Sequence, residues 1–194
     1  MNRSLTTVVG FALALAVLPT LATAQRAEWT TLFDGSSLDR WNAIGSANWA
    51  LADRAVGAND GNGFLVSDRS YDDFELRLEF WVDEPANSGI FIRCADPSSV
   101  NDRNCYEVNI YDTRADQTYR TGGIVHLAAP NVVISSGGQW NTYHITAQGS
   151  RLIVSLNGDE MVDTTDDQFS SGPFALQYAA GTVRFRNVQI RALD

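Results

Sequence analysis

The stretch from Phe74 to Val82 reads FELRLEFWV and alternates apolar with polar or charged side chains almost throughout. Successive side chains of a β-strand point to opposite faces, so this pattern predicts a strand with one buried and one solvated face. No segment after residue 24 shows a sustained helical period, and short alternating or β-branched runs recur between clusters of glycine, asparagine, aspartate and proline. The chain is therefore predicted to be all-β.

The remaining strands are expected in runs of the same kind. Residues 143–148 and 151–156 predict a hairpin, and the apolar positions of the last strand fall out of step at Arg186-Asn187, which predicts a bulge there. About a dozen strands without a helix imply a two-sheet antiparallel β-sandwich, because a single sheet cannot bury a hydrophobic face by itself. The other expected strands lie near residues 49–51, 63–66, 89–93, 106–111, 123–127, 174–178 and 183–191.

The first 24 residues have the pattern of a secretory signal peptide. A basic start at Met1-Asn2-Arg3 precedes an apolar stretch from Val8 to Val17, and Ala22-Thr23-Ala24 supplies a cleavage site. We expect cleavage after Ala24, leaving residues 25–194 as one periplasmic or secreted domain. No later apolar run is long enough to span a bilayer, so no membrane insertion is expected.

The charge and the cysteines fit an exported protein. The formal net charge is −9, and such a surface repels nucleic acid and anionic lipid. Cys94 and Cys105 are the only cysteines, and in an oxidising compartment they are expected to form a disulfide worth roughly 2 to 4 kcal/mol. Metal ligation by the two thiols would need partners, and no second cysteine pair or nearby histidine offers them.

Polar side chains interrupt two apolar runs on either side of these cysteines. Arg93 ends the run Asn87–Arg93, and Glu107 and Asn109 lie within the run Tyr106–Asp112. Charges that converge inside buried strands indicate a functional site, although an Arg93–Glu107 ion pair on a solvated sheet face explains two of them without any function. If Cys94 and Cys105 faced each other in a regular ladder, Arg93 and Glu107 would lie on opposite faces. A shared site therefore requires the disulfide to sit beyond the ladder or beside a bulge.

Nine short motifs follow one another along the chain: Leu32-Phe33-Asp34-Gly35, Tyr71–Leu76, Asn87–Arg93, Tyr106-Glu107-Val108, Gly122-Gly123-Ile124, Trp140-Asn141, Leu156-Asn157-Gly158, Leu176-Gln177 and Phe185–Val188. Taken in this order, they resemble the 3-keto-disaccharide hydrolase domain family. The resemblance implies a concanavalin A-like jelly roll, which agrees with the strand pattern. Two positions depart from the family: Asn109 stands where glutamine is common, and Val125-His126 stand where an aromatic tyrosine is more often found.

The activity that the resemblance implies is cleavage of glycosides whose sugar carries a ketone at carbon 3. The ketone acidifies the proton on carbon 2, so the reaction needs a general base, a group that stabilises the enolate and an acid for the departing oxygen. Glu107 is the expected base, Arg93 the group that holds the enolate charge, and His126 the acid or a metal ligand. The expected substrate-binding residues are Asn109, Asp112, Gln177 and Tyr178.

The expected ligand is thus a carbohydrate, and a non-catalytic carbohydrate-binding module is the main alternative because both functions use this fold. A structural role as an envelope adhesion domain is a third reading. No cofactor is required, and a divalent metal is possible: residues 59–63 and 96–104 are rich in oxygen ligands that suit calcium, although such residues also dominate ordinary turns. Zincin, nucleotide-binding and serine-hydrolase motifs are absent, and the sequence assigns no oligomeric state.

Overall fold

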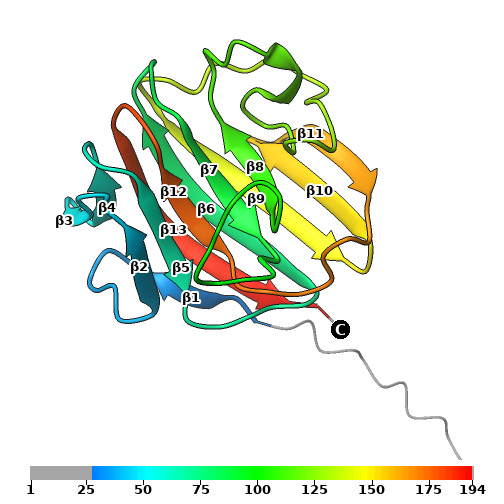
Figure 1. Cartoon of the computed structure of the whole chain (residues 1–194), viewed down its shortest axis with the longest axis horizontal. Helices are drawn as coiled ribbons and strands as arrows, with labels where there is room; N and C mark the ends of the chain where they lie inside the picture. Colours follow the sequence, from blue (N-terminus) through cyan, green and yellow to red (C-terminus); the bar gives the residue numbers. More distant parts are fainter. Residues whose placement is uncertain (1–27, 194) are drawn as a thin grey trace, which may run out of the picture.

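A computed structural model describes residues 28–193 as two antiparallel β-sheets packed face to face (Figure 1). The larger sheet has eight strands in the order β11-β10-β9-β6-β13-β4-β3, with β1 also paired to β13. The smaller sheet has five strands in the order β2-β5-β12-β7-β8. The predicted all-β sandwich is confirmed, and the one helical element among the described residues is the short 3-10 turn η1, Gln117–Tyr119.

The larger sheet is built from β1 (Thr30–Phe33), β3 (Ala50–Ala52), β4 (Ala55–Ala58), β6 (Phe74–Val82), β9 (Trp140–Gln148), β10 (Arg151–Leu156), β11 (Asp159–Thr165) and β13 (Val183–Ala192). The smaller sheet is built from β2 (Trp41–Gly45), β5 (Gly63–Ser67), β7 (Ser88–Ile92), β8 (Tyr106–Ile110) and β12 (Ala175–Tyr178).

Strand β6 lies between β9 and β13 and supplies the centre of the core. Its five alternating apolar side chains are buried against the smaller sheet, while the charged residues between them face solvent. Burying each such side chain contributes about 2 kcal/mol relative to leaving it in water. The buried set is Phe74, Leu76, Leu78, Phe80 and Val82.

Two local predictions about the larger sheet are also confirmed. The register between β13 and β6 shifts between Arg186 and Gln189, and Asn187 takes a positive φ of 53°, so the bulge restores the inward direction of the later apolar residues. Strands β9 and β10 form the expected hairpin, in which Gln148 pairs with Arg151.

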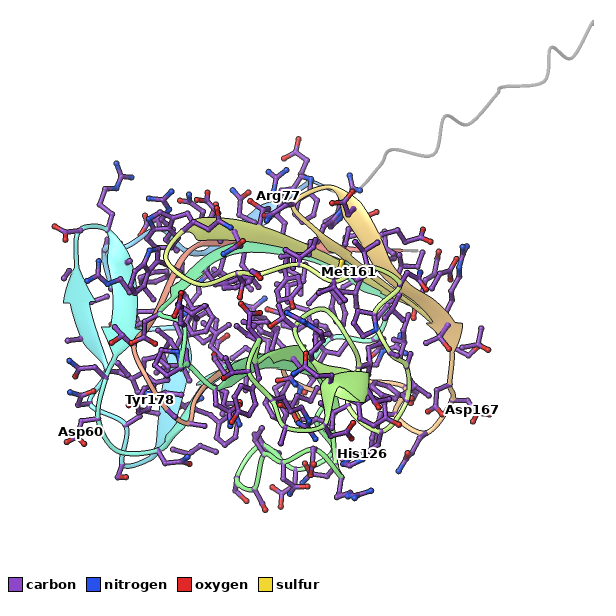
Figure 2. The ribbon with its side chains drawn as sticks, turned by 90° about the horizontal axis from the view of Figure 1, so that it is seen from above. Asp60, Arg77, His126, Met161, Asp167 and Tyr178 are labelled. Atoms are coloured by element: carbon purple, nitrogen blue, oxygen red, sulfur yellow. A yellow bond between two sulfur atoms is a disulfide. The ribbon has the colours of Figure 1, made fainter. Side chains whose placement is uncertain are left out.

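Strands β7 and β8 of the smaller sheet are buried on both faces, which explains why apolar residues occupy both faces of these strands. The inner face of this sheet packs on the core. On its outer face, the side turned away from the larger sheet, Phe91 packs against Val100 of the loop between β7 and β8. The expected disulfide between Cys94 and Cys105 closes that loop. Figure 2 shows the two layers one above the other, with Arg77 and His126 on opposite sides of the sandwich.

The predicted signal peptide, residues 1–24, lies outside the described residues. Within residues 28–193, no helix has the length and apolar character needed to cross a membrane.

Candidate functional site

Glu107 lies on the outer face of the smaller sheet, where the alternation of β8 separates it from the core. Its neighbours Tyr106 and Val108 point into the core, whereas Glu107 pairs with Phe91 on β7. The residue is only 7% exposed. A Cβ atom at Gly89 would lie 3.1 Å from Glu107 Oε1, so the carboxylate rests directly over a position that has no side chain. Any larger residue at position 89 would crowd the carboxylate.

This burial gives Glu107 the protonation behaviour of a base that works near neutral pH. The pKa of the Glu107 carboxyl is raised to about 7, chiefly by desolvation and also by the negative charge of Asp102, while the positive charge of Arg114 opposes both. A carboxyl with a pKa close to the working pH is well matched to general acid–base catalysis.

Two amide side chains share the outer face with Glu107. Asn109 follows it by two residues on β8, and Gln177 follows Ala175, which pairs with Phe91, by two residues on β12. Asn109 Nδ2 donates to the carbonyl of Tyr119, but Asn109 Oδ1 and Gln177 Oε1 are buried without a hydrogen-bond partner. A buried acceptor without a partner costs about 1 to 3 kcal/mol, so a ligand that donates hydroxyl groups would be favoured here.

His126 lies at the rim of this face because its segment runs alongside β8. The Val125 amide donates to the Glu107 carbonyl over 3.0 Å, and the next residue, His126, takes a positive φ of 66°. His126 Nε2 lies 2.8 Å from Oδ2 of Asp102, which belongs to the disulfide-closed loop. The backbone thus places His126 next to Val125, the residue whose amide bonds the Glu107 carbonyl, and Asp102 is the carboxylate partner of His126.

Arg93 is not part of this group. Its guanidinium is 1% exposed and bonds Asp73 Oδ1 over 2.9 Å, on the side of the larger sheet. Its other hydrogen bonds go to the carbonyl oxygens of Asp72, Gly149 and Phe169. No contact between Arg93 and Glu107 occurs among the described residues, so the expectation of a shared site is corrected.

The backbone at Arg93 explains this placement. The last ladder pair is Ile92 with Tyr106, and Arg93 then takes a left-handed φ of 52°. The alternation is interrupted there, so Cys94 takes the outer face together with Cys105 and the Arg93 side chain turns toward the larger sheet. The break in the ladder that a shared site required is therefore present at Arg93, but it separates the Arg93 guanidinium from the Glu107 carboxylate.

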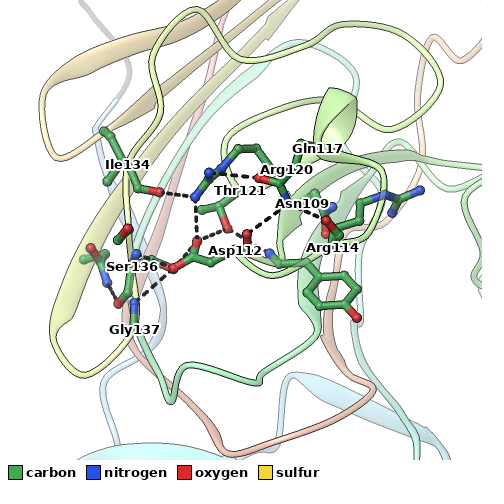
Figure 3. Close-up of polar contacts among 12 residues, drawn as sticks. Asn109, Asp112, Arg114, Gln117, Arg120, Thr121, Ile134, Ser136 and Gly137 are labelled. Atoms are coloured by element: carbon green, nitrogen blue, oxygen red, sulfur yellow. Dashed lines mark hydrogen bonds and ion pairs between the residues drawn. The ribbon is translucent and has the colours of Figure 1, made fainter.

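Asp112 also has a role within the fold. Figure 3 shows its carboxylate at the centre of a network that joins the end of β8 to the segment before β9. It accepts from Thr121 Oγ1 over 2.5 Å and from the Ser136 amide over 2.6 Å, and it lies 3.8 Å from Arg120. These contacts occupy the carboxylate and leave little of it for a substrate.

Tyr178 faces the core, because adjacent residues on a strand point to opposite faces and Gln177 points outward. Its ring packs edge-on against Trp49, and its hydroxyl donates to the Gly181 carbonyl over 3.1 Å. The structure therefore separates Tyr178 from Gln177, the other residue expected from the same motif.

The sequence analysis did not identify Asp102 and Arg114, the two residues whose charges act on Glu107. Asp102 carried a usable signal, because the expected disulfide closes its loop between the two strands that carry the polar residues. Arg114 lies in an irregular segment after β8, and no periodicity indicates where such a side chain lies. Within residues 28–193, no three histidine, cysteine, aspartate or glutamate side chains gather closely enough to hold a metal ion.

Comparisons with known proteins agree with the fold and with the resemblance noted in the sequence. The family model of the 3-keto-alpha-glucoside-1,2-lyase-like domain matches residues 28–191. A proposed glycosyl hydrolase from Parabacteroides distasonis is 24% identical with a TM-score of 0.74, covering 86% of this chain and 100% of that one. A second from the same organism is 17% identical with a TM-score of 0.78, covering 92% and 99%.

A carbohydrate-binding module has the same architecture. The module CBM66 from Bacillus subtilis is 20% identical with a TM-score of 0.59, covering 86% of this chain and 97% of that one. These likenesses establish the jelly-roll fold. A search of curated protein sequences finds no match.

Proposed function

Because the chain belongs to the 3-keto-alpha-glucoside-1,2-lyase-like domain family, we propose that it cleaves glycosides oxidised to a ketone at carbon 3, with Glu107 as the general base. Family membership supports a carbohydrate-active enzyme in general. The finer assignment depends on one observation, a buried carboxylate with a pKa of about 7 on a face that also carries two unpaired amide oxygens.

The chemistry follows from the acidity that the ketone confers on carbon 2. Glu107 in its ionised form removes the proton from carbon 2, negative charge develops on the ketone oxygen, and the bond from carbon 1 to the departing oxygen then breaks. Asn109 Oδ1 and Gln177 Oε1 accept hydrogen bonds from sugar hydroxyl groups in this proposal. Neither acceptor has a hydrogen-bond partner among the described residues, so a ligand rich in hydroxyl groups would satisfy both.

Arg93 takes no part in this proposal, because four protein oxygens already bond its guanidinium. In this proposal Arg114 stabilises the developing enolate charge, and the lowering effect of its positive charge on the pKa of Glu107 supports that role. We also infer export of the enzyme from the pattern of residues 1–24.

The direct test is incubation of the protein with a 3-keto-glucoside, followed for release of the departing group. Release by the wild type supports the proposal, and a parallel incubation with chelator decides whether a divalent metal takes part. The second candidate is a carbohydrate-binding module, favoured by the unpaired amide acceptors, which would bind sugar equally well without chemistry. Binding of the keto-sugar without any release would favour that candidate.

A further inference from the structure

The outer face of the larger sheet, the side turned away from the smaller sheet, carries arginine side chains stacked on indole rings. The guanidinium carbon of Arg184 lies 5.2 Å from the centre of the Trp81 ring, and that of Arg186 lies 3.9 Å from the centre of the Trp140 ring. Trp81 on β6 pairs with Arg184 on β13 and with Trp140 on β9. The four side chains therefore form one strip across three neighbouring strands.

Two arginines of this face keep donors that no protein group uses. Within residues 28–193, Arg184 makes no hydrogen bond or ion pair, and Arg77, labelled in Figure 2, makes a single hydrogen bond, from Nε to Gln189. Arg77 also stacks on the Trp29 ring, 4.1 Å from its centre. A stack uses the flat face of a guanidinium, so its in-plane N–H groups stay available, and their fork matches the two oxygens of a carboxylate. Both side chains therefore suit an anionic ligand.

The charge of this face is opposite in sign to that of the whole chain, which is −9. On β6 and β13 the outward positions hold four arginines and two glutamates, a surplus of two positive charges. One glutamate, Glu79, is paired with Arg186. The other, Glu75, is paired with Arg191. Charges more than about 8 Å away are largely screened at physiological salt, so the local surplus acts on a ligand that touches this face.

Each of the two arginines with spare donors borders a hollow. The hollow beside Arg184 measures about 220 Å³, and its floor includes Ala50 and Gly57, a cross-strand pair with almost no side chain. The hollow beside Arg77 measures about 290 Å³ and is lined by polar groups, among them the amide of Asn187. Space beside a cation, together with amide groups, suits a carboxylate that belongs to a sugar ring.

The spacing of the two arginines favours a long ligand. Arg77 and Trp81 are four residues apart on β6, and Arg184 is the cross-strand partner of Trp81. At about 3.4 Å per residue, the two arginines are about 14 Å apart along the strands. A single carboxylate reaches only one of them, whereas a chain with a carboxylate on each repeating unit contacts both.

We propose that the outer face of the larger sheet binds an acidic polysaccharide, a chain of sugars that carry carboxylate groups, through Arg77 and Arg184. This site lies on the opposite side of the sandwich from Glu107 and does not depend on the proposed reaction. Binding there holds the protein on a polymer and leaves the face that carries Glu107 uncovered.

Other classes of partner match this face less well. The centre of a protein interface is depleted of charge, whereas the area between the two arginines contains the Glu79–Arg186 ion pair and the polar Asn187. Duplex DNA carries one charge per about 1.7 Å, so the acidic remainder of the chain opposes it more strongly than a polymer with one charge per sugar ring.

The experiment compares polygalacturonate with the same polymer after methyl esterification, which keeps the sugar chain and removes its charge. Calorimetric titration at low salt should detect binding of the acidic polymer only, and added salt should weaken it. Arg77→Gln and Arg184→Gln should each weaken binding roughly tenfold, because each removes a charged hydrogen-bonding group. Arg151→Gln is the matched control on the same face. Its guanidinium already bonds Asp163, so binding should change less than about twofold.

Equal binding of the two polymers, or no binding of polygalacturonate, would overturn the proposal. Losses in Arg77→Gln and Arg184→Gln that do not exceed the loss in Arg151→Gln would also overturn it, as would tighter binding of duplex DNA. Sedimentation velocity tests the remaining occupant: a dimer that Arg184→Gln dissociates would assign the face to a second copy of this chain instead. Failure of the wild type to cleave a 3-keto-glucoside would reject the proposed function and leave the titration result standing, so the two failures are distinguishable.

Discussion

Arg93 and Glu107 leave the β7–β8 pair on opposite sides, with the Arg93 guanidinium bonded to Asp73 and the Glu107 carboxylate over Gly89. Each therefore has a different consequence for the protein. Arg93 joins the turn before β6, the β9–β10 turn and the segment before β12, whereas Glu107 is left buried without a cationic partner at hydrogen-bond distance among the described residues. The first contributes to stability, and the second is free for chemistry.

We expect Arg93→Met to destabilise the fold by about 3 to 5 kcal/mol, because breaking a buried ion pair leaves its partners unsatisfied. Urea denaturation measures the loss. The matched control is Arg151→Met, which removes an exposed ion pair with Asp163 and should change stability little. Any folded Arg93→Met protein should retain its turnover to within about threefold. A large loss of turnover with unchanged stability would show that Arg93 takes part in catalysis.

Glu107→Gln should reduce turnover of a 3-keto-glucoside by roughly 10²-fold or more while leaving sugar binding largely intact. The amide keeps the shape of the side chain and removes its basicity. Steady-state rates and a separate binding titration check the two halves of this expectation. Unchanged turnover would reject Glu107 as the base.

The pH dependence of kcat/KM should report the ionisation of Glu107. The ionised form is the base, so activity should rise with pH through about 7, the pKa that burial gives this carboxyl. Asp102 raises that pKa through its negative charge, so Asp102→Asn should move the acid limb to lower pH. Asp96→Asn, on the same loop, should leave the limb in place. An acid limb that stays near pH 4.5 in the wild type, the usual value for a glutamate, would contradict the assignment.

The same pKa makes a prediction about stability. The folded state holds a proton on Glu107 between the usual value of 4.5 and about 7, where the unfolded chain has released it. The stability that this proton supports is therefore full below about pH 4.5 and is lost as pH rises through 7, by an amount of the order of 3 kcal/mol. Glu107→Gln should remove this loss, so the variant should gain thermal stability over the wild type at about pH 8 and little at about pH 5. If Glu107→Gln changed thermal stability equally at pH 5 and pH 8, the change would not come from burial of the Glu107 charge.

The sequence predicted the fold better than it predicted the site, and particular residues show why. The alternation of Phe74–Val82 and the bulge at Arg186-Asn187 both depend on which way side chains point along a single strand. The order of apolar and polar residues in the sequence shows that direction. The same rule separates Gln177 from Tyr178 and could have excluded Tyr178. The direction of Arg93 depends instead on a left-handed backbone angle at a residue that is not glycine, and no local pattern indicates it.

The Cys94–Cys105 disulfide should stabilise the fold, because it closes a loop whose Val100 is buried on the outer face of the smaller sheet. Replacing both cysteines by serine should lower the free energy of unfolding by roughly 3 kcal/mol, the value expected for a loop of this length. Urea denaturation measures the loss, and hydrogen exchange of residues 95–104 measures the loosening of the loop. An unchanged free energy of unfolding would show that the disulfide adds nothing to the packing of Val100.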